Sequence, residues 1–280
     1  MFQKISNQNL NASSKENFLI QSFRIIINDL QCIIKCSTLD LCSLAIIDDS
    51  ICKIYIKNDL RESNLIYSTT STIYVKTTYN QINKYLIYYW PLNGNYFELI
   101  SKANLYNDLK VSFVTDRFNR LNSSIYLNYG RIYVPSGYYI YEDFTLTAWI
   151  KMYTLETFRR FFRLELSGGY SIMFSLSHNN AVNRGPYFYY YSNDVIANTS
   201  LTIGKWQHLA FAMKGSTLSI YIDGTCVSRS LTDTVGAPYV SAAYFGFASS
   251  NAPNMAIDDI KIYNISLSQN EIIQSSFSNL

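Results

Sequence analysis

Residues 201–228, which decide the fold, read LTIGKWQHLAFAMKGSTLSIYIDGTCVS. Two turn signals, Lys214-Gly215-Ser216 and Asp223-Gly224, divide this stretch into three short segments, and Asp-Gly is a favoured tight hairpin turn. In the middle segment, 217–222, apolar residues alternate with hydroxyl-bearing ones, which is the period of a half-buried strand. The stretch therefore predicts an antiparallel meander in an all-β domain.

The composition of the 280-residue chain suits a β-sandwich. Hydrophobic residues make up 48%, aromatic residues 16% and charged residues only 15%, so the polar surface must come from Asn, Ser, Thr and Tyr. Tyr and Thr also favour strands. The net charge of +3 is not gathered in a long basic run, which argues against nucleic acid as a partner. The sequence contains no apolar stretch of about 18 residues, so it predicts no membrane-spanning helix.

Four segments resemble one known family, in the same order along the chain. Gly204–Ala210 followed by Leu218–Gly224 resembles the core signature of laminin-G-like and pentraxin-like jelly rolls of the concanavalin A-like superfamily. The other three segments are Tyr88–Asn95, Phe144–Lys151 and Ile257–Asn264. This resemblance implies a mostly β fold, a two-sheet antiparallel jelly-roll sandwich at residues 83–280. It also implies that Trp90, Trp149, Trp206 and His208 are structural.

Four of the five cysteines, Cys32, Cys36, Cys42 and Cys52, lie within 21 residues and indicate a local framework. Their spacing resembles the inner core of a PAN/apple domain, in which a helix is stapled to a central hairpin. The resemblance implies the disulfides Cys36–Cys42 and Cys32–Cys52. A zinc site is the alternative, but these cysteines do not form the Cys-x2-Cys pairs that are usual in zinc sites.

The sequence thus predicts three parts: a disordered tail at 1–12, an apple-like module at 13–82 and the jelly roll at 83–280. Within the module we expect a helix over 25–36 and strands at 41–47, 52–56 and 72–76.

Disulfides indicate an oxidising compartment. Four Asn-x-Ser/Thr sequons add to this indication, at Asn11, Asn122, Asn198 and Asn264. We expect a secreted protein or an ectodomain, although residues 1–17 lack the apolar core of a signal peptide. The fifth cysteine, Cys226, is expected to be a buried free thiol or to pair with another chain.

Candidate ligand-binding residues lie in one strand and the loop before it. Tyr187, Tyr189 and Tyr191 share one face of a predicted strand, and saccharides stack on exposed aromatic rings. The alternative is that these tyrosines only fill the sandwich. His178 and Asn180 lie in a polar loop that could contact a sugar or a protein at the rim of the sheet.

The sequence gives little support for catalysis. Glycoside hydrolases of related folds need two facing carboxylates on one strand, typically as Glu-x-Asp-x-Glu, and this chain has no such motif. We therefore predict no enzyme, but an extracellular, non-enzymatic, lectin-like protein that binds carbohydrate. The alternatives are an adhesion module that binds another extracellular protein and, more remotely, a glycoside hydrolase.

No cofactor is required by these predictions, but a structural calcium ion is conceivable. Related folds bind calcium through carboxylates and backbone oxygens. By resemblance, the ligands here would be Asn93 with Asp258 or Asp259. The alternative is that the two aspartates only accept hydrogen bonds from turn amides.

Overall fold

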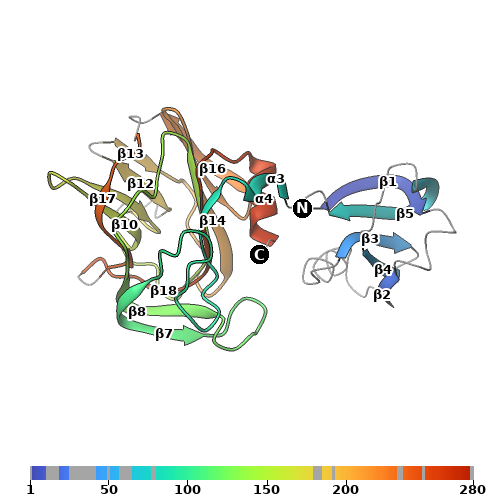
Figure 1. Cartoon of the computed structure of the whole chain (residues 1–280), viewed down its shortest axis with the longest axis horizontal. Helices are drawn as coiled ribbons and strands as arrows, with labels where there is room; N and C mark the ends of the chain where they lie inside the picture. Colours follow the sequence, from blue (N-terminus) through green and yellow to red (C-terminus); the bar gives the residue numbers. More distant parts are fainter. Residues whose placement is uncertain are drawn as a thin grey trace. The chain divides into compact units, whose positions relative to one another are not determined.

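The computed structural model describes residues 2–10, 19–24, 42–48, 51–56, 65–76, 80–178, 185–190, 193–231, 236–247 and 250–277. The chain divides into two compact units, Met1–Asn83 together with Leu280, and Lys84–Asn279. Figure 1 shows both, coloured along the sequence. Among the described residues, no helix has the length and apolar character needed to cross a membrane.

The N-terminal unit contains a five-stranded antiparallel sheet with the strand order β1-β5-β3-β4-β2. Its strands are β1 (Phe2–Leu10), β2 (Leu19–Arg24), β3 (Cys42–Asp48), β4 (Ile51–Ile56) and β5 (Leu65–Lys76), followed by the short helix α3 (Asn80–Asn83). The strands predicted at 41–47, 52–56 and 72–76 are confirmed. The predicted helix over 25–36, with Cys32 and Cys36, lies outside the described residues.

One prediction for this unit needs correction. Residues 1–12 were expected to form a disordered tail, but Phe2–Leu10 is strand β1. It pairs with β5 in an antiparallel ladder from Phe2 opposite Lys76 to Leu10 opposite Leu65. Backbone pairing of this kind needs no apolar run, so the polar composition of the segment did not reveal it.

The second unit is an antiparallel sandwich. Within its described residues, thirteen strands follow the order β13-β12-β11-β10-β17-β8-β18-β9-β14-β15-β16, with β6 on β18 and β7 on β8. The strands are β6 (Leu86–Trp90), β7 (Tyr106–Val114), β8 (Ser124–Val134), β9 (Phe144–Met152), β10 (Arg160–Leu166), β11 (Ser171–Ser175), β12 (Tyr187–Tyr190), β13 (Asn193–Ile196), β14 (Trp206–Lys214), β15 (Thr217–Ile222), β16 (Thr225–Leu231), β17 (Val240–Gly246) and β18 (Asn254–Tyr263). The mostly β fold is confirmed.

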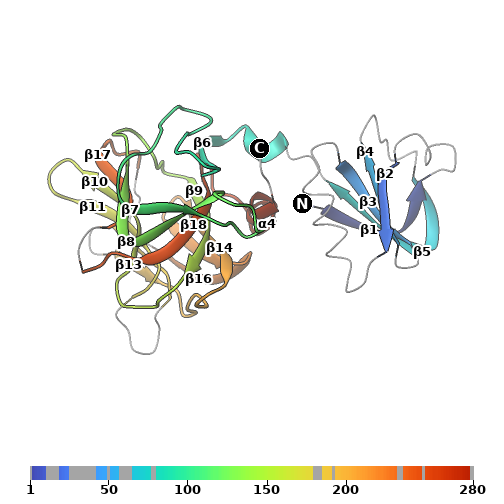
Figure 2. The same cartoon turned by 90° about the horizontal axis from the view of Figure 1, so that it is seen from below.

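Strand β8 connects the two layers of the sandwich through its backbone hydrogen bonds. Its first half pairs with β18 and its second half with β17, and Tyr129, at φ 53°, interrupts it between them. A positive φ in a non-glycine residue redirects the chain. Strand β7 pairs along β8 on its other side (Figure 2).

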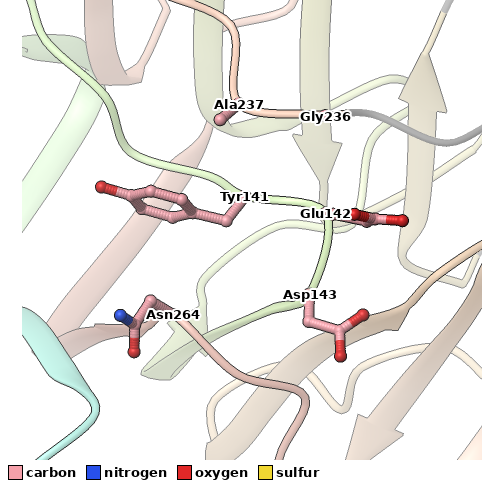
Figure 3. Close-up of a pocket in the computed structure, with 6 residues that line it drawn as sticks. All are labelled: Tyr141, Glu142, Asp143, Gly236, Ala237 and Asn264. Carbon is pink, nitrogen blue, oxygen red and sulfur yellow. The ribbon is translucent and has the colours of Figure 1, made fainter.

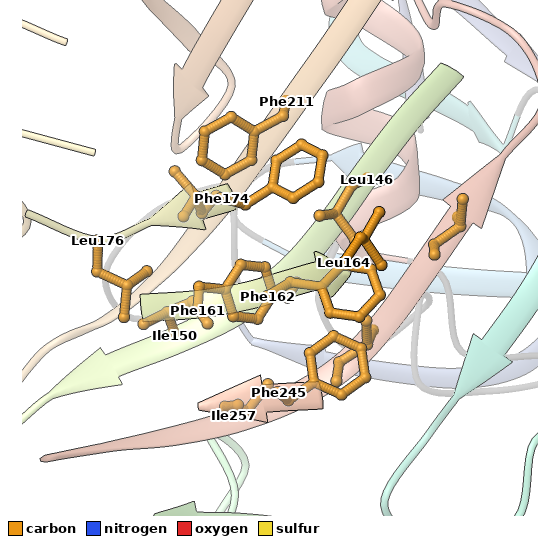
Figure 4. Close-up of a cluster of buried hydrophobic side chains, with 14 of the residues drawn as sticks. Leu146, Ile150, Phe161, Phe162, Leu164, Phe174, Leu176, Phe211, Phe245 and Ile257 are labelled. Atoms are coloured by element: carbon orange, nitrogen blue, oxygen red, sulfur yellow. The ribbon is translucent and has the colours of Figure 1, made fainter. Parts of the chain in front are cut away.

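The core lies between the two layers. Phe162 of β10 and Phe245 of β17 face it from one layer, with ring centroids 4.4 Å apart. Phe174 of β11 meets Phe211 of β14 from the other layer at 5.1 Å. All four rings have no exposed surface, and Figure 4 shows them in one cluster with the surrounding aliphatic side chains. Burial of such large rings is the main driving force for the fold.

The meander predicted from residues 201–228 is confirmed as β14, β15 and β16. Asp223 and Gly224 both have positive φ, 51° and 76°, as the tight hairpin turn between β15 and β16 requires. The middle strand differs from the prediction in one respect. Ser219 and Tyr221, on its outer face, are only 6% and 4% exposed, so β15 is covered on both faces.

The C-terminal helix α4 (Gln269–Phe277) packs on the outside of the layer that contains β9. The Ser268 side chain and Glu271 cap its first turn reciprocally, since Glu271 Oε2 accepts a hydrogen bond of 2.8 Å from the Ser268 amide. The indole of Trp149 donates to the carbonyl of Ser276 at 3.1 Å. A Cβ on Gly224 would lie 2.4 Å from Ile273, which shows how closely the helix approaches the hairpin turn.

Candidate functional site

A pocket of about 560 Å³ opens beside the sandwich where three segments meet. We call it the acidic pocket, and it is lined by Tyr141, Glu142, Asp143, Gly236, Ala237 and Asn264. These residues come from the chain just before β9, the chain just before β17 and the end of β18. Figure 3 shows Tyr141, Asp143 and Asn264 around one open space, with Gly236 and Ala237 across from them.

Two of the segments are joined by a β-bridge. Gly137 and Val240 exchange backbone hydrogen bonds of 3.0 and 2.8 Å. The bridge places Tyr138 beside Tyr239, with ring centroids 5.5 Å apart in an edge-to-face arrangement. These rings are 50% and 51% exposed. The same two segments therefore carry an exposed aromatic pair and a polar pocket.

Two tyrosines, the partly buried Tyr88 and the buried Tyr139, fix the segment that carries Tyr138. The hydroxyl of Tyr88 donates to the carbonyl of Tyr138 at 2.9 Å, and that of Tyr139 donates to the carbonyl of Pro135 at 2.5 Å. Burial raises the pKa of Tyr88 to about 12, so its hydroxyl keeps the proton that it donates. The ring of Tyr88 also stacks on Trp90 at 5.5 Å.

The two carboxylates of the pocket differ in their partners. Asp143 Oδ1 accepts a hydrogen bond of 2.7 Å from the amide of Gly215, in the turn between β14 and β15. The side chain of Glu142 is exposed. Asp143 is thus held in position while Glu142 extends from the same loop, and together with Asn264 and the Tyr141 phenol they present groups that can bind sugar hydroxyls.

The residues predicted to bind a ligand lie elsewhere. Tyr187 is 3% exposed, and its ring is 5.0 Å from His178 and 6.2 Å from Phe158. Arg160 donates to its hydroxyl. The structure brings Tyr187 and His178 together, but in a packed cluster rather than on an open platform. Tyr189 is half-buried, and Asn180 and Tyr191 lie outside the described residues.

The predicted calcium ligands Asp258 and Asp259 form ion pairs with the side chain of Arg117. Arg117 donates to both carboxylates, with 2.6 Å from Nη2 to Asp259 Oδ2. The Tyr89 hydroxyl donates to Asp259 at 2.6 Å. Burial, and then the charge of Asp259, raises the pKa of Asp258 to about 8. These carboxylates are therefore engaged by a guanidinium and a phenol.

The third predicted calcium ligand, Asn93, is exposed in the loop after β6, and its carbonyl accepts a hydrogen bond of 3.1 Å from Asn95. Within the described part of the chain, no group of three or more His, Cys, Asp or Glu side chains is arranged to hold a metal ion.

The residues expected to be structural occupy the framework. Trp90 has no exposed surface and donates to the carbonyl of Ala103 at 2.9 Å. His208 is 2% exposed and lies 5.4 Å from the ring of Trp149. Burial, and then the charges of Lys261 and Arg117, lowers the pKa of His208 to about 3, so this imidazole is neutral. Trp206 is half-buried.

The sequons and the fifth cysteine are placed as follows. Asn122, Asn198 and Asn264 are exposed, and Asn11 lies outside the described residues. Asn264 is also part of the acidic pocket. Cys226 is a half-buried free thiol, so it is less buried than expected.

Sequence reasoning missed Tyr138, Tyr239 and Tyr141 as parts of a site. For Tyr138 and Tyr141 the local signal is the run of aromatic and acidic residues at 138–143, immediately before a strong strand. The partner segment lies about 100 residues further on, and no spacing rule joins the two.

Comparison with known proteins gives a family and a set of similar folds. The family described as "Concanavalin A-like lectin/glucanases superfamily" matches residues 126–273, which is more than half of the chain. The search of curated proteins found no match.

Among solved structures, domain 4 of AbnA, a GH43 extracellular arabinanase from Geobacillus stearothermophilus solved with arabinotriose, aligns with a TM-score of 0.56 at 16% identity. The alignment covers 68% of this chain and 97% of that one. The binding domain of Paraclostridial Mosquitocidal Protein 1 aligns at 0.53 and 19% identity, covering 70% and 52%. A Trypanosoma rangeli sialidase aligns at 0.54 and 14%, covering 89% and 38%.

These likenesses show the fold, and the present chain spans only about half of the toxin domain and less of the sialidase. They also correct the functional prediction. An arabinanase domain and a sialidase are among the similar structures, and these enzyme neighbours weigh against the claim that the protein is a non-enzymatic binding protein. With four family-like segments in order, a sandwich built around them and a match to residues 126–273, the chain belongs to the concanavalin A-like lectin/glucanase superfamily.

Proposed function

We propose that residues 84–279 form a glycan-recognition domain that serves the processing of glycans, and that the acidic pocket holds a neutral sugar. The observation that carries this proposal is the exposed pair Tyr138 and Tyr239 on the same two segments as the pocket. The similarity to domain 4 of an arabinanase, solved with arabinotriose, supports a role beside glycoside-cleaving enzymes.

The chemistry of the pocket fits an uncharged sugar. Aromatic rings stack on the apolar faces of sugar rings, and two exposed rings at an interplanar angle of 73° offer a face and an edge. Carboxylate and amide oxygens of Glu142, Asp143 and Asn264 can accept hydrogen bonds from hydroxyl groups. Because two carboxylates line the pocket, an anionic sugar would be repelled. The volume of about 560 Å³ is within the usual range for small-molecule sites.

The test is binding of arabinotriose and of neutral gluco-oligosaccharides to the full chain, measured by titration calorimetry. The double variant Tyr138→Ala/Tyr239→Ala should weaken binding about tenfold, because it removes both stacking rings. Tyr170→Ala is the matched control, since this tyrosine is equally exposed, at 51%, but lies before β11. Equal affinity of the double variant and the wild type would contradict the proposal.

A second readout addresses hydrolysis at the same pocket. Glu142 and Asp143 are two carboxylates in one pocket, and glycoside cleavage uses such a pair. Release of reducing ends from arabinan or β-glucan that is abolished by Glu142→Gln would assign catalysis to the pocket. Binding without release would leave recognition as the function of this domain.

For the N-terminal unit we propose an apple-like module with the disulfides Cys36–Cys42 and Cys32–Cys52. The clustered cysteines support this proposal, and they also support passage through an oxidising compartment. Peptide mapping of the non-reduced secreted protein should recover these two cross-linked pairs. Recovery of four free thiols would contradict both the module and the compartment.

A further inference from the structure

A second surface with a different charge lies on the outer face of the layer that contains β10. Its residues are joined by strand register. Tyr106 of β7 is opposite Tyr133 of β8, Tyr133 is opposite Tyr244 of β17, and Tyr244 is opposite Arg163 of β10. Residues directly opposite in an antiparallel ladder point to the same face. The row therefore crosses four neighbouring strands (Figures 1 and 2).

The rings of this row touch one another. The centroids of Tyr106 and Tyr133 are 5.7 Å apart in a stacked arrangement, and those of Tyr133 and Tyr244 are 5.8 Å apart, edge to face. Tyr106 is 50% exposed, Tyr133 is half-buried and Tyr244 is 6% exposed. The row is open at its β7 end and is most covered at Tyr244 of β17.

Two arginines lie over aromatic rings. The guanidinium of Arg131 is 4.8 Å from the centroid of Tyr133, and that of Arg163 is 5.4 Å from the centroid of Phe247. A guanidinium that contacts a ring can still donate N–H groups to an anion. We call the surface the arginine–tyrosine face, and it consists of Tyr106, Arg131, Tyr133, Arg163, Glu165, Tyr244 and Phe247.

The charge of this face is only partly balanced. Glu165 is the one acid among the residues just named. Its Oε1 lies 2.7 Å from Arg163 Nε and accepts a hydrogen bond of 2.8 Å from the Tyr244 hydroxyl. Burial, followed by this hydrogen bond, raises the pKa of Tyr244, so the phenol keeps its proton. Arg131 has no acidic partner within 4 Å among the described residues, and its Nε is buried without a hydrogen-bond partner. One positive charge therefore remains.

We propose that the arginine–tyrosine face binds an anionic polysaccharide. Sugar rings would stack on Tyr106 and Tyr133, and a carboxylate or sulfate of the same chain would pair with Arg131. The uncompensated guanidinium beside an open pair of rings is what selects an acidic glycan over a neutral one. The face is separate from the acidic pocket, and its ligand does not depend on what the pocket binds.

The experiment is affinity electrophoresis of the full chain in native gels that contain polygalacturonate, heparin or dextran. Polygalacturonate supplies carboxylates, heparin supplies sulfates as well, and dextran is neutral. We expect retardation by at least one of the two anionic polymers and not by dextran, and we expect it to disappear in about 0.5 M salt, because surface ion pairs are screened there.

Two variants test the residues. Arg131→Gln should weaken binding of the retarding polymer about tenfold, and Tyr106→Ala about threefold. Lys205→Gln removes the same unit of charge from an exposed position on the loop before β14, so it controls for the change in net charge. Because Tyr106 is half-exposed, its variant also tests the face if Arg131→Gln does not fold.

The outcomes are distinct. Retardation weakened in Arg131→Gln or Tyr106→Ala, but unchanged in Lys205→Gln and in Tyr138→Ala/Tyr239→Ala, supports the proposal whatever the pocket binds. Equal retardation of all variants, binding of dextran as strong as that of the anionic polymers, or no retardation by either anionic polymer overturns it. None of these results bears on the binding of arabinotriose by the pocket.

Discussion

The acidic pocket and the arginine–tyrosine face use the same kinds of side chain and differ in charge and in how they are built. Both combine exposed tyrosines with charged groups. Tyr138 lies on the same segment as Glu142 of the pocket, and Tyr106 stacks on Tyr133, the ring that Arg131 contacts in the face. The pocket is assembled from segments outside the strands and carries two carboxylates. The face lies on strands and carries an unbalanced cation. One sandwich can thus offer two surfaces that select ligands of different charge.

The two regions should also respond differently to substitutions, because different contacts hold them in place. The pocket depends on single hydrogen bonds between loops, such as Asp143 to Gly215, and on one β-bridge. The face depends on the register of four strands, and this register is coupled to the core through Phe162 and Phe245. Changes in the pocket should therefore be local, whereas changes beneath the face should affect folding as well as binding.

The largest expected effect concerns both regions at once, because it comes from a buried histidine of the framework that they share. The pKa of His208 is about 3 in the folded protein, against about 6.5 when exposed, since burial disfavours its charged form. Stability from this group is complete above pH 6.5 and is lost as the pH falls toward 3. At pH 4 the free energy of unfolding should be lower by about 3 kcal/mol on its account.

The measurement is urea unfolding, followed by tryptophan fluorescence at pH 7 and pH 4, for the wild type and His208→Gln. Asp258 has a raised pKa, so its contribution to the free energy of unfolding increases as the pH falls from 8 toward 3.8. Because both proteins contain Asp258, the contribution of His208 is the difference between their losses of stability. The variant should lose less stability in acid than the wild type. The same loss in both proteins would show that His208 does not cause it.

A second variant should damage the face and leave the pocket intact. A Cβ on Gly130 would lie 2.2 Å from the carbonyl of Leu109 and 2.7 Å from that of Lys110, so Gly130→Ala must push β7 away from β8. We expect a loss of about 2 kcal/mol in stability and loss of binding to the anionic polymer, because Tyr106 moves with β7. Calorimetry and affinity electrophoresis measure the two effects.

Gly137→Ala is the matched control, at the bridge that supports the pocket. Its Cβ would meet only the ring of Tyr139, at an ordinary contact distance of 3.7 Å. This variant should be close to the wild type in stability and in both binding assays. If Gly130→Ala weakened arabinotriose binding as much as polymer binding, the two surfaces would not be independent.

The sequence predicted the sandwich well because its signals are local. Turn residues such as Asp223-Gly224 and the alternation in 217–222 depend only on a few neighbouring residues. The strands of the meander follow directly from them. Such signals say which face of a strand is apolar, but not which distant strand pairs with it.

The sites could not be predicted because they depend on that distant pairing. Arg117 donates a hydrogen bond to Asp258 from 141 positions away, so a calcium site suggested by the acids alone omitted the cation that engages them. Tyr187 alternates correctly with Phe188, yet His178 and Arg160 cover its outer face. Alternation predicts that a side chain points away from the core, and only the surrounding segments decide whether it reaches solvent.

A third prediction concerns the pocket alone. Asp143→Ala should lower stability by about 1 kcal/mol, because it leaves the amide of Gly215 without its acceptor, and it should weaken binding of arabinotriose. Asp143→Asn keeps an acceptor and removes the charge, so it should restore most of the stability. Thermal unfolding separates the two variants. Equal destabilisation by both would mean that the charge, rather than the hydrogen bond, holds the loop.

The smallest effect sharpens the difference in charge between the two regions. Glu165→Gln removes the acid of the arginine–tyrosine face, while its amide oxygen can still accept the hydrogen bond of the Tyr244 hydroxyl. The guanidinium of Arg163 is then released from its ion pair, so affinity for the anionic polymer should rise about threefold, with a steeper dependence on salt. Arabinotriose binding should not change. Weaker binding of the polymer would instead mean that Glu165 positions Arg163, and that the orientation of the guanidinium matters more than the net charge of the face.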